Sequence, residues 1–292
     1  MKKIRIVSPA KSVEGKLIDF AKNHLESLGF EVSVGANAKG EFNYFSGTDE
    51  ERLADMQSAF DADIDVILCA RGGYGSVRIL DQLDWAAFNK QPKLIAGYSD
   101  ITVFHNRMNK IGIPSLHSTV PLNFQENTAE ALNSLVEVFT AGSNSYEIAS
   151  HKLNRLGEVD AEIVGGNMAI LSTLCGTDDD LNTDNKILFI EDIGEAIYAV
   201  DRMMYQFKKA GKFENLKGLI VGGMTGMKDS AIPFGKTIEE VISDAVKGYD
   251  FPLCFNFPAG HIKDNRAILF GSKARLQVNS ERAIFSQDFK GV

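Results

Sequence analysis

The sequence predicts an α/β fold built around a buried parallel sheet. Short aliphatic or β-branched runs alternate with segments of helical period, which is the pattern of successive βαβ units. With 44% hydrophobic and 24% charged residues, the composition is that of an ordinary globular protein. A chain of 292 residues is long enough for two domains, and each can bury a core of its own.

The expected elements follow this alternation along the chain. In the first half we expect strands at 4–7, 32–34, 66–69 and 94–97 and helices at 17–28, 49–60 and 101–110. In the second half we expect strands at 161–164, 187–190, 219–221 and 253–257 and helices at 168–174, 199–209 and 237–246. Residues 142–145 and 151–155 lack periodicity and carry turn-forming residues, which predicts a linker. We therefore expect one domain at 1–150 and a second at 151–292.

Charge and cysteine content exclude several classes of protein. The net charge of −8 argues against a general nucleic-acid binder, which needs a basic surface. Cys69, Cys175 and Cys254 are isolated from one another, so they fit neither a disulfide framework nor a zinc motif. Charged residues and a proline interrupt the apolar stretch at the N-terminus, and no segment approaches the length of a membrane span. We expect a cytoplasmic protein with no membrane or nucleic-acid partner, no metal and no cofactor.

Ser99 follows the strand expected at 94–97, just before an expected helix. A serine at a tight strand-to-helix turn projects its hydroxyl from the carboxyl end of the sheet, where the first N–H groups of the helix can receive an oxyanion. The nucleophile-elbow pattern G-x-S-x-G is matched at Gly97 and Ser99, but Ile101 stands where the second glycine belongs. The alternative is that Ser99 only caps the helix, and the local sequence alone favours that cap.

A glycine-rich segment follows the strand expected at 66–69. Three of the four residues 72–75 are glycines, which lets the backbone turn sharply and present its N–H groups to a developing negative charge. The segment lacks the lysine and spacing of a P-loop and the spacing of G-x-G-x-x-G, so nucleotide binding is the weaker interpretation. A glycine-rich connection without any ligand is the other alternative.

Glu191 follows the apolar run 187–190, at the carboxyl end of an expected strand. A carboxylate at that position can orient a histidine and stabilise its charge, as the third member of a triad does. Strand alternation places Glu191 on the face of Ile187 and Phe189, with Asp192 on the opposite face. The alternative is that the acidic residues only begin the next helix, where they favour its dipole.

His261 is the candidate for the catalytic base. It follows Pro258-Ala259-Gly260 in a loop after an expected strand, and such a flexible approach can present the imidazole. A single loop histidine is often only solvated, so the assignment depends on its partners. The other histidines are His24 and His105 in expected helices, His117 after a short apolar run where it can line a pocket, and His151 in the expected linker.

Ser99, Glu191 and His261 occur in the chain order serine, acid, histidine, and each follows an expected strand. Catalytic loops gather at the carboxyl ends of parallel strands. The three residues together therefore predict a Ser-Glu-His triad more strongly than any one of them does.

These segments together resemble the L,D-carboxypeptidase family, which includes the microcin C self-immunity peptidases. The matching pieces are Arg71-Gly72-Gly73-Tyr74-Gly75 with residues 78–84, Gly97-Tyr98-Ser99-Asp100, Gly165-Gly166-Asn167, Ile190-Glu191-Asp192 with Tyr198 and Asp201-Arg202, and Gly260-His261. The resemblance implies a flavodoxin-like parallel-sheet N-terminal domain, a smaller mixed α/β C-terminal domain and a triad at their junction.

The resemblance also implies roles for single residues. It maps the nucleophile to Ser99, the acid to Glu191 and the base to His261. The oxyanion donors map to the backbone N–H groups of Gly73 and Asp100, and Gly72 and Tyr74 are expected to contact the substrate. Family members are commonly homodimers, so a homodimer is expected here.

The activity that the resemblance implies is a serine carboxypeptidase that hydrolyses the terminal L,D amide bond of a murein tetrapeptide and releases D-alanine. One alternative is the microcin C-like branch, which cleaves an amide in an aminoacyl-nucleotide and carries an aromatic residue in a longer loop before the acid strand. Residues 176–187 are a short span without an aromatic residue, which favours the carboxypeptidase. The other alternative is a non-catalytic small-ligand-binding protein on the same scaffold, which the presence of all three triad residues disfavours.

Overall fold

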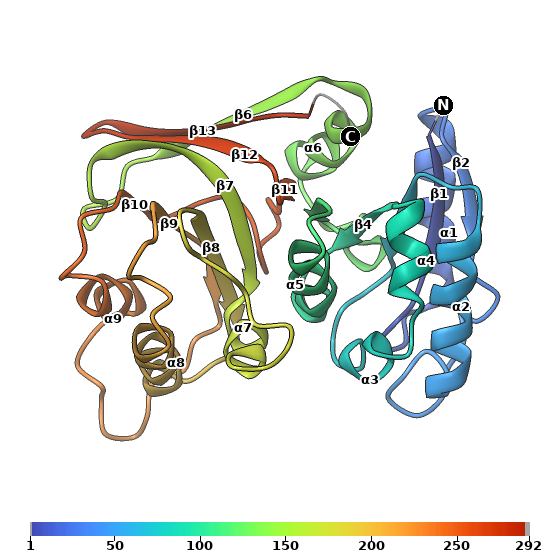
Figure 1. Cartoon of the computed structure of the whole chain (residues 1–292), viewed down its shortest axis with the longest axis horizontal. Coiled ribbons are helices and arrows are strands. Elements are labelled where there is room, and N and C mark those ends of the chain that lie inside the picture. The colour runs from blue at the N-terminus through green and yellow to red at the C-terminus, as the bar shows by residue number, and fades with distance from the viewer. Residues whose placement is uncertain (1, 290–292) are drawn as a thin grey trace.

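The computed structural model describes residues 2–289 and contains two β-sheets flanked by helices (Figure 1). One sheet is formed mainly by the first half of the chain and the other mainly by the second half. This arrangement confirms the predicted α/β fold class. Within the described residues, no helix is both long and apolar enough to cross a membrane.

The first sheet has six strands in the order β11-β5-β4-β3-β1-β2. Their bounds are β1 (Lys3–Val7), β2 (Glu31–Val34), β3 (Val66–Cys69), β4 (Leu94–Gly97), β5 (Ser115–His117) and β11 (Ile268–Phe270). The first five pair in parallel in the order 2-1-3-4-5, which is the flavodoxin-like order. β3 and β4 are buried along their whole length, because helices cover both faces, and their sequences are accordingly continuous apolar runs.

Six helices cover the two faces of the first sheet. They are α1 (Gly15–Ser27), α2 (Asp49–Asp61), α3 (Val77–Leu80), α4 (Trp85–Lys90), α5 (Thr102–Lys110) and α6 (Ala129–Thr140). Buried side chains of α1 and α6 form one core cluster with the sheet, while those of α2 to α5 form another on the opposite face. α2 begins with a capping box, in which Thr48 and Glu51 satisfy each other's backbone N–H groups.

The second sheet has seven strands in the order β10-β9-β8-β7-β12-β13-β6. Their bounds are β6 (Ser143–Ala149), β7 (Gly157–Asn167), β8 (Ile187–Ile193), β9 (Gly218–Thr225), β10 (Leu253–Cys254), β12 (Lys273–Val278) and β13 (Arg282–Asp288). β7 to β10 are parallel, whereas β12, β13 and β6 pair antiparallel, so the sheet is mixed as expected.

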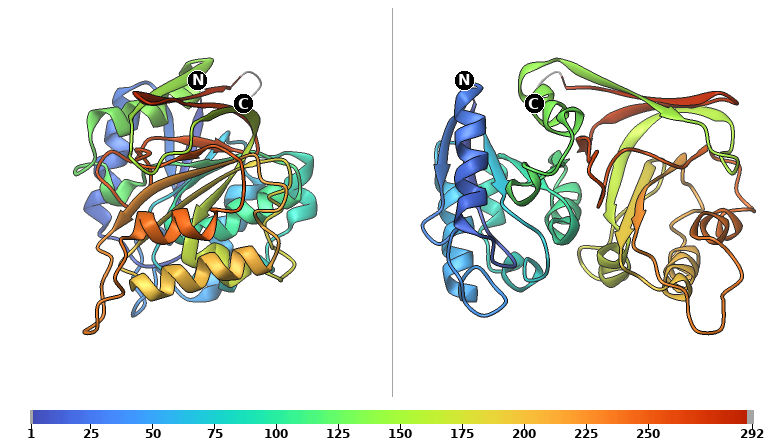
Figure 2. Two further views of the ribbon diagram at one scale, coloured as in Figure 1. Left: turned by 90° about the vertical axis from the view of Figure 1, so that its left-hand side faces the viewer. Right: turned by 180° about the vertical axis from the view of Figure 1, so that it is seen from behind.

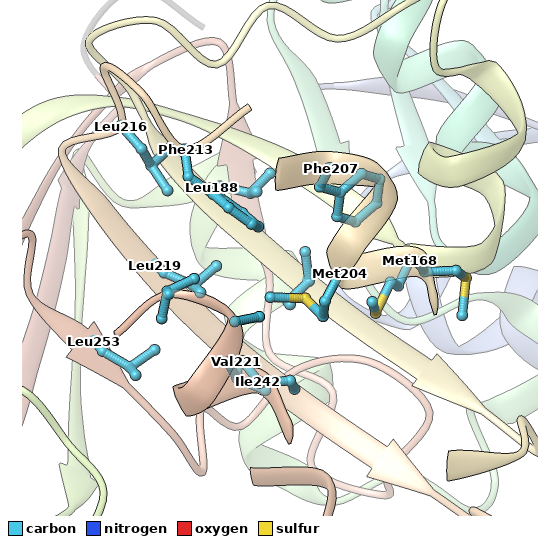
Figure 3. Close-up of a cluster of buried hydrophobic side chains, with 14 of the residues drawn as sticks. Met168, Leu188, Met204, Phe207, Phe213, Leu216, Leu219, Val221, Ile242 and Leu253 are labelled. Carbon is cyan, nitrogen blue, oxygen red and sulfur yellow. The ribbon is translucent and has the colours of Figure 1, made fainter. Parts of the chain in front are cut away.

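Helices α7 (Met168–Leu174), α8 (Ile197–Lys209) and α9 (Ile238–Ala245) pack on one face of the second sheet, and α8 and α9 lie in front of it in Figure 2. Figure 3 shows the core of that face, where Met204 and Phe207 of α8 lie near Leu188 of β8. Side chains of the opposite face, including Phe189, share a cluster with the antiparallel strands. β8 therefore alternates between two cores, in agreement with the predicted alternation.

The linker expected from the sequence is found only in part. Residues 143–149 form strand β6 with alternating buried and exposed side chains, so the prediction of an irregular linker at 142–145 is wrong. Residues 151–155 do lack helix and strand. β6 joins the second sheet and β11 joins the first, so strands are exchanged across residue 150, and the division into domains at that position stays a prediction.

The two sheets approach each other where β4 and β8 end. The Thr102 hydroxyl at the start of α5 accepts a hydrogen bond of 2.9 Å from the backbone N–H of Asn167 at the end of β7. Asn167 is in turn paired in register with Glu191 of β8. The contact therefore places the segment after β4 beside the carboxyl end of β8.

Candidate active site

Ser99 lies in a backbone conformation that serine adopts rarely. Its φ is +66°, in the left-handed region, directly after β4 and at the start of a single 3₁₀ turn, Ser99–Ile101. A non-glycine residue held in that region marks a tight turn under strain, as at a nucleophile elbow. Tyr98 is the N-cap residue of this turn and Ile101 is that of α5, while the Ser99 hydroxyl lies within hydrogen-bond distance of His261. The interpretation of Ser99 as a helix cap is therefore wrong.

The structure brings Ser99, His261 and Glu191 into one chain of hydrogen bonds. The Ser99 Oγ lies 3.2 Å from the Nε2 of His261, and the Nδ1 of His261 lies 2.7 Å from the Oε2 of Glu191. Glu191 is fully buried, while the His261 side chain is 13% exposed. An Nδ1–H that donates to Glu191 leaves Nε2 free to accept the hydroxyl proton of Ser99, which is the tautomer a general base requires.

The loop that carries His261 is held in place by backbone contacts. The backbone N–H of His261 donates to Glu191 Oε2 at 3.1 Å, and its carbonyl accepts from the Thr225 hydroxyl at 2.8 Å. Gly260 has a φ of +104°, and a Cβ there would lie 2.7 Å from both the Cβ and the Oε2 of Glu191. Only glycine allows the loop to come this close to the carboxylate.

A second buried carboxylate lies beside Glu191. Asp192 is 2% exposed and accepts hydrogen bonds from the backbone N–H of Ala169 and from the side-chain amide of Asn167, at 2.8 and 2.9 Å. The same Asn167 amide lies 3.3 Å from Glu191 Oε1. Burial raises the pKa of Asp192 to about 6, with the charge of Glu191 acting in the same direction. Asn167 thus links the two carboxylates. It lies against Oε1 of Glu191, whereas His261 contacts Oε2.

The environment of His261 favours its protonated form. Burial lowers the pKa of the imidazole, but the hydrogen bond and the charge of Glu191, helped by Asp192, outweigh that effect. The net pKa of His261 is therefore raised above its ordinary value. A base of raised pKa beside a serine hydroxyl is a stronger proton acceptor.

The glycine-rich loop after β3 lies against the nucleophile. A Cβ at Gly72 would lie 2.9 Å from the Ser99 Cβ and 3.1 Å from the backbone nitrogen of Asp100, so only glycine fits. The backbone N–H of Gly73 has no hydrogen-bond partner among the described residues. The N–H groups of Gly73 and Asp100 lie on the two segments that meet at Ser99, which suits the predicted oxyanion role.

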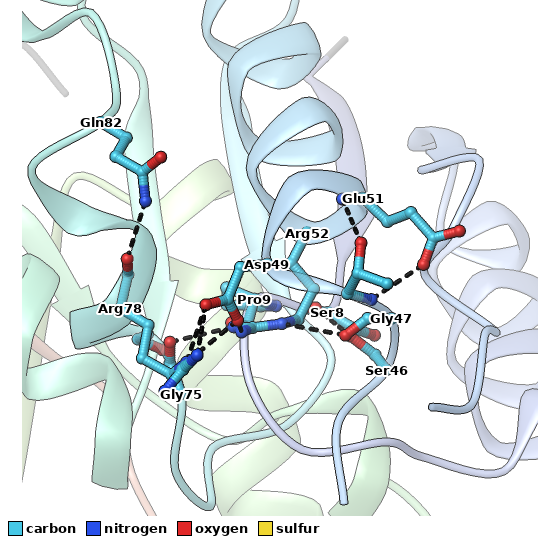
Figure 4. Close-up of polar contacts among 12 residues, drawn as sticks. Ser8, Pro9, Ser46, Gly47, Asp49, Glu51, Arg52, Gly75, Arg78 and Gln82 are labelled. Atoms are coloured by element: carbon cyan, nitrogen blue, oxygen red, sulfur yellow. Dashed lines mark hydrogen bonds and ion pairs between the residues drawn. The ribbon is translucent and has the colours of Figure 1, made fainter. Parts of the chain in front are cut away.

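The glycine-rich loop is tied to its surroundings by buried polar contacts (Figure 4). The carboxylate of Asp100 accepts a 2.9 Å hydrogen bond from the backbone N–H of Ser76. Arg52 of α2 is buried, and its guanidinium donates to the carbonyl of Gly75 at 2.9 Å and to that of Pro9 at 2.5 Å. These contacts fix the end of the loop from two sides.

A cleft of about 500 Å³ adjoins His261. Its lining includes His261, Tyr98, Asn123, Glu126 and Lys263. The Tyr98 ring lies 4.8 Å from the His261 ring, and its hydroxyl donates to the Asn123 side chain at 3.0 Å. The cleft thus gives an extended ligand access to one side of the triad.

The remaining sequence-based candidates lie around this site rather than in it. Tyr74 is 48% exposed on the outer side of the glycine-rich loop, with its ring near Phe45, and its predicted substrate contact stays a prediction. His117 does not line a pocket, because it is fully buried, and neither ring nitrogen has a hydrogen-bond partner in the described part of the chain. His105 is also buried, in α5.

No cluster of three His, Cys, Asp or Glu side chains that would hold a metal ion occurs within residues 2–289. The described cysteines are all free thiols. Burial raises the pKa of the Cys69 thiol, which keeps it protonated and unreactive.

Four residues that shape the site were not expected to do so from the sequence. They are Arg52, Asn167, Asp192 and Thr225. A signal existed for Asn167, since asparagine before an apolar run is typical of a helix N-cap, and it does cap α7. Arg52 and Thr225 act through contacts to residues far away in sequence, which no local pattern reveals.

Comparison with protein families gives two matches, one in each half of the chain. Residues 4–118 match the LD-carboxypeptidase N-terminal domain, and residues 160–276 match the LD-carboxypeptidase C-terminal domain. Ser99 falls within the first range, and Glu191 and His261 fall within the second.

Two curated relatives cover nearly the whole chain. The chain is 31% identical to the probable murein peptide carboxypeptidase of Bacillus subtilis, over 96% of this chain and 90% of the relative. It is 28% identical to the murein tetrapeptide carboxypeptidase of Pseudomonas aeruginosa, over 96% of this chain and 94% of the relative.

Solved structures show the same architecture. The muramoyltetrapeptide carboxypeptidase from Oxalobacter formigenes superposes with a TM-score of 0.90 at 29% identity, over 98% of both chains. The microcin C7 self immunity protein MccF, in complex with aspartyl sulfamoyl adenosine, superposes with a TM-score of 0.86 at 20% identity, over 99% of this chain and 96% of that one. At that level of identity the second likeness concerns the fold alone.

Proposed function

Because the chain belongs to the LD-carboxypeptidase family, we propose that it is a serine-type carboxypeptidase that hydrolyses the terminal L,D amide bond of a murein tetrapeptide. The observation that carries the proposal is the hydrogen-bond chain from Ser99 through His261 to Glu191. The strained backbone of Ser99 supports its role as nucleophile, and so does its hydroxyl, which lies within hydrogen-bond distance of His261.

The first half of the reaction forms an acyl-enzyme. His261 Nε2 takes the hydroxyl proton of Ser99 while Oγ attacks the amide carbonyl carbon, and Glu191 stabilises the imidazolium. The N–H groups of Gly73 and Asp100 stabilise the oxyanion of the tetrahedral intermediate. The C–N bond then breaks, and His261 returns its proton to the nitrogen of the leaving amino acid.

The second half regenerates the enzyme. A water molecule attacks the ester carbonyl and gives its proton to His261, which passes it to Ser99 Oγ as the ester bond breaks. The net reaction consumes one water and yields a tripeptide and a free amino acid, with no change in oxidation state. The residues described here supply every proton transfer that it requires.

The substrate class rests on the relatives and on one feature of this chain. Two relatives that cover nearly the whole chain are named as carboxypeptidases of murein peptides. The segment between α7 and β8 contains no aromatic ring that would stack on a nucleobase. This favours a peptide over an aminoacyl-nucleotide as the substrate.

Location and assembly are part of the proposal. The free thiols of Cys69, Cys175 and Cys254 suit a reducing compartment, so we place the enzyme in the cytoplasm, where cell-wall fragments would be recycled. We also propose that the enzyme assembles as a homodimer, as the resemblance implies. Light scattering on the purified protein gives the mass directly, and a monomeric mass at micromolar concentration would contradict the dimer.

The proposed activity is tested by product analysis. The purified protein is incubated with a panel of L,D-linked peptides and with an aminoacyl sulfamoyl adenosine, and the products are identified by mass spectrometry. We expect loss of one alanine residue from the tetrapeptide and no change in the nucleotide. Cleavage of the nucleotide alone, or of neither compound, would contradict the proposal.

A further inference from the structure

A carboxypeptidase must recognise a free carboxylate close to the bond that it cuts. The leaving amino acid carries that group one residue beyond the scissile amide, and one residue spans about 3.8 Å. A cationic group that binds it therefore has to lie within a few ångströms of the nucleophile and the oxyanion loop. The triad itself supplies no such cation.

Arg71 is one of two cationic residues beside the nucleophile and its oxyanion loop. The other, Lys11, packs its stem against Gly73 and has its ammonium group over the Tyr44 ring. Arg71 directly precedes Gly72, whose backbone is in close contact with Ser99. The preceding residue, Ala70, accepts a 3.0 Å backbone hydrogen bond from Leu122, which lines the cleft beside His261. The backbone of Arg71 thus lies between a residue that touches Ser99 and a residue that is bonded to the wall of the cleft.

The charge of Arg71 is not neutralised within the described residues. One guanidinium nitrogen donates to the carbonyl of Ser12 at 3.0 Å, and no carboxylate lies within 4 Å. Among residues 2–289 its other nitrogens have no hydrogen-bond partner, and none of them is completely buried. By contrast, Arg107 pairs with Asp179, and Arg155, which also lacks an acidic partner, donates to three carbonyls. A half-buried guanidinium with most of its donors free is a site for an anion.

The charge of Arg71 acts in the direction of the cleft. Burial and the charge of Glu191 raise the pKa of the Tyr98 hydroxyl, whereas the charge of Arg71 acts in the opposite direction. Tyr98 lines the cleft and packs against the His261 ring. A carboxylate in that part of the cleft therefore lies in the field of Arg71.

We propose that Arg71 binds the free terminal carboxylate of the substrate and so makes the enzyme an exopeptidase, an inference that rests on the proposed function. The planar guanidinium can hold a carboxylate through two parallel hydrogen bonds. Lys263 also lines the cleft, but it is exposed and strongly hydrated, and such a lysine contributes little to binding.

The test compares two substrates that differ only at the terminal group. One is the L,D-linked tetrapeptide with a free D-alanine carboxylate, and the other is the same peptide ending in D-alaninamide. The kcat/KM for each is measured by quantifying the released amino acid or amide. Wild-type protein should prefer the free acid by about 10- to 100-fold, the range expected for a charge-assisted bidentate contact.

Arg71→Gln is the variant that isolates the charge, because its amide can still donate to the Ser12 carbonyl. The ratio of the two kcat/KM values should fall to near one in Arg71→Gln and should be partly retained in Arg71→Lys. A purely structural role of Arg71 in the loop would lower both values together and leave the ratio unchanged. The matched control Lys263→Gln should keep the wild-type ratio.

Each other outcome decides against the inference in a different way. An undiminished preference in Arg71→Gln, or its loss in Lys263→Gln, would assign the carboxylate to another group. Equal cleavage of acid and amide by wild-type protein would refute the inference and leave the proposed hydrolase standing. Cleavage of neither peptide would refute the proposed function, and this inference with it.

Discussion

At the scale of single residues, the backbone of Ser99 decides its interpretation. A serine with φ of +66° carries a strain of about 1–2 kcal/mol that a glycine would not. The surrounding contacts maintain this strained conformation. The hydroxyl points to His261 rather than to a backbone N–H. A residue selected only to cap a helix has no reason to occupy this conformation.

Two substitutions of Ser99 should separate chemistry from stability. Ser99→Ala and Ser99→Gly both remove the nucleophile, so each should lower hydrolysis of the tetrapeptide by about 10⁴-fold or more. Ser99→Gly should nevertheless be more stable than Ser99→Ala by about 0.5–1 kcal/mol, because glycine tolerates the positive φ. Urea unfolding measures the difference. Activity of either variant within a few-fold of wild type would remove Ser99 from the mechanism.

The two neighbouring carboxylates should differ sharply in their effect on catalysis. Glu191→Gln should lower kcat roughly 10³- to 10⁴-fold, because the amide cannot stabilise the imidazolium that forms on His261. Asp192→Asn should cost far less, since Asp192 faces α7 and does not touch His261. Glu195→Gln serves as a third, more exposed comparison. If Asp192→Asn were the crippling change, the assignment of the acid to Glu191 would be wrong.

The pH dependence of kcat/KM should reflect the raised pKa of His261. The general base must be neutral, and the folded protein favours its protonated form. Activity should therefore rise with pH through an apparent pKa above 6.5, the ordinary value for histidine, and fall steadily below it. The pH–rate profile of wild-type protein measures this value. In Glu191→Gln the main raising influence is removed, so the apparent pKa should drop, and an unchanged profile would contradict the assignment.

At the scale of secondary-structure elements, the parallel strands other than β5 were predictable and the antiparallel ones were not. β3 and β4 are covered on both faces, so their sequences are unbroken apolar runs. β6 and β13 are buried on one face only, and their alternating polar residues resemble a loop. α6 was not expected, although Thr128 is a typical N-cap residue at its start.

Arg52 shows how a helix far away in sequence supports the site. Arg52→Met should lower the free energy of unfolding by roughly 2–4 kcal/mol, because it leaves the carbonyls of Pro9 and Gly75 without partners in a buried place. It should also lower kcat more than it raises KM, since the loop that bears the oxyanion donor loses an anchor.

Arg78→Met is the matched control, because Arg78 pairs with the same Asp49 from a 45% exposed position. It should cost less than about 1 kcal/mol, as expected of a surface ion pair. Urea unfolding and steady-state kinetics of both variants test the role of Arg52. Equal effects of the two substitutions would show that the buried carbonyl contacts of Arg52 add nothing to stability or to kcat.

At the scale of the whole molecule, the site exists only where the two sheets meet. Ser99 follows a strand of the first sheet, whereas Glu191 and the His261 loop belong with the second. The three residues could be named from the sequence because each follows a strand expected from the sequence, and the resemblance added their roles. In the structure β8 extends beyond the expected strand and includes Glu191. The distances that join these three residues could not be derived from the sequence, because they depend on long-range contacts such as that of Thr102 with Asn167. The same is true of Arg52, whose partners come from loops distant in sequence.

The measurement that tests the account most directly compares two diastereomeric tetrapeptides. One ends in the L,D amide bond with D-alanine, and the other ends in L-alanine with the same preceding residues. Inverting the terminal centre changes how its methyl group and carboxylate fit beside the scissile bond, which moves the carbonyl carbon away from Ser99 and the oxyanion donors. The account predicts release of D-alanine at a kcat/KM larger by orders of magnitude than that for L-alanine, and no release by Ser99→Ala. Equal cleavage of the two diastereomers, or full activity without the Ser99 hydroxyl, would contradict it.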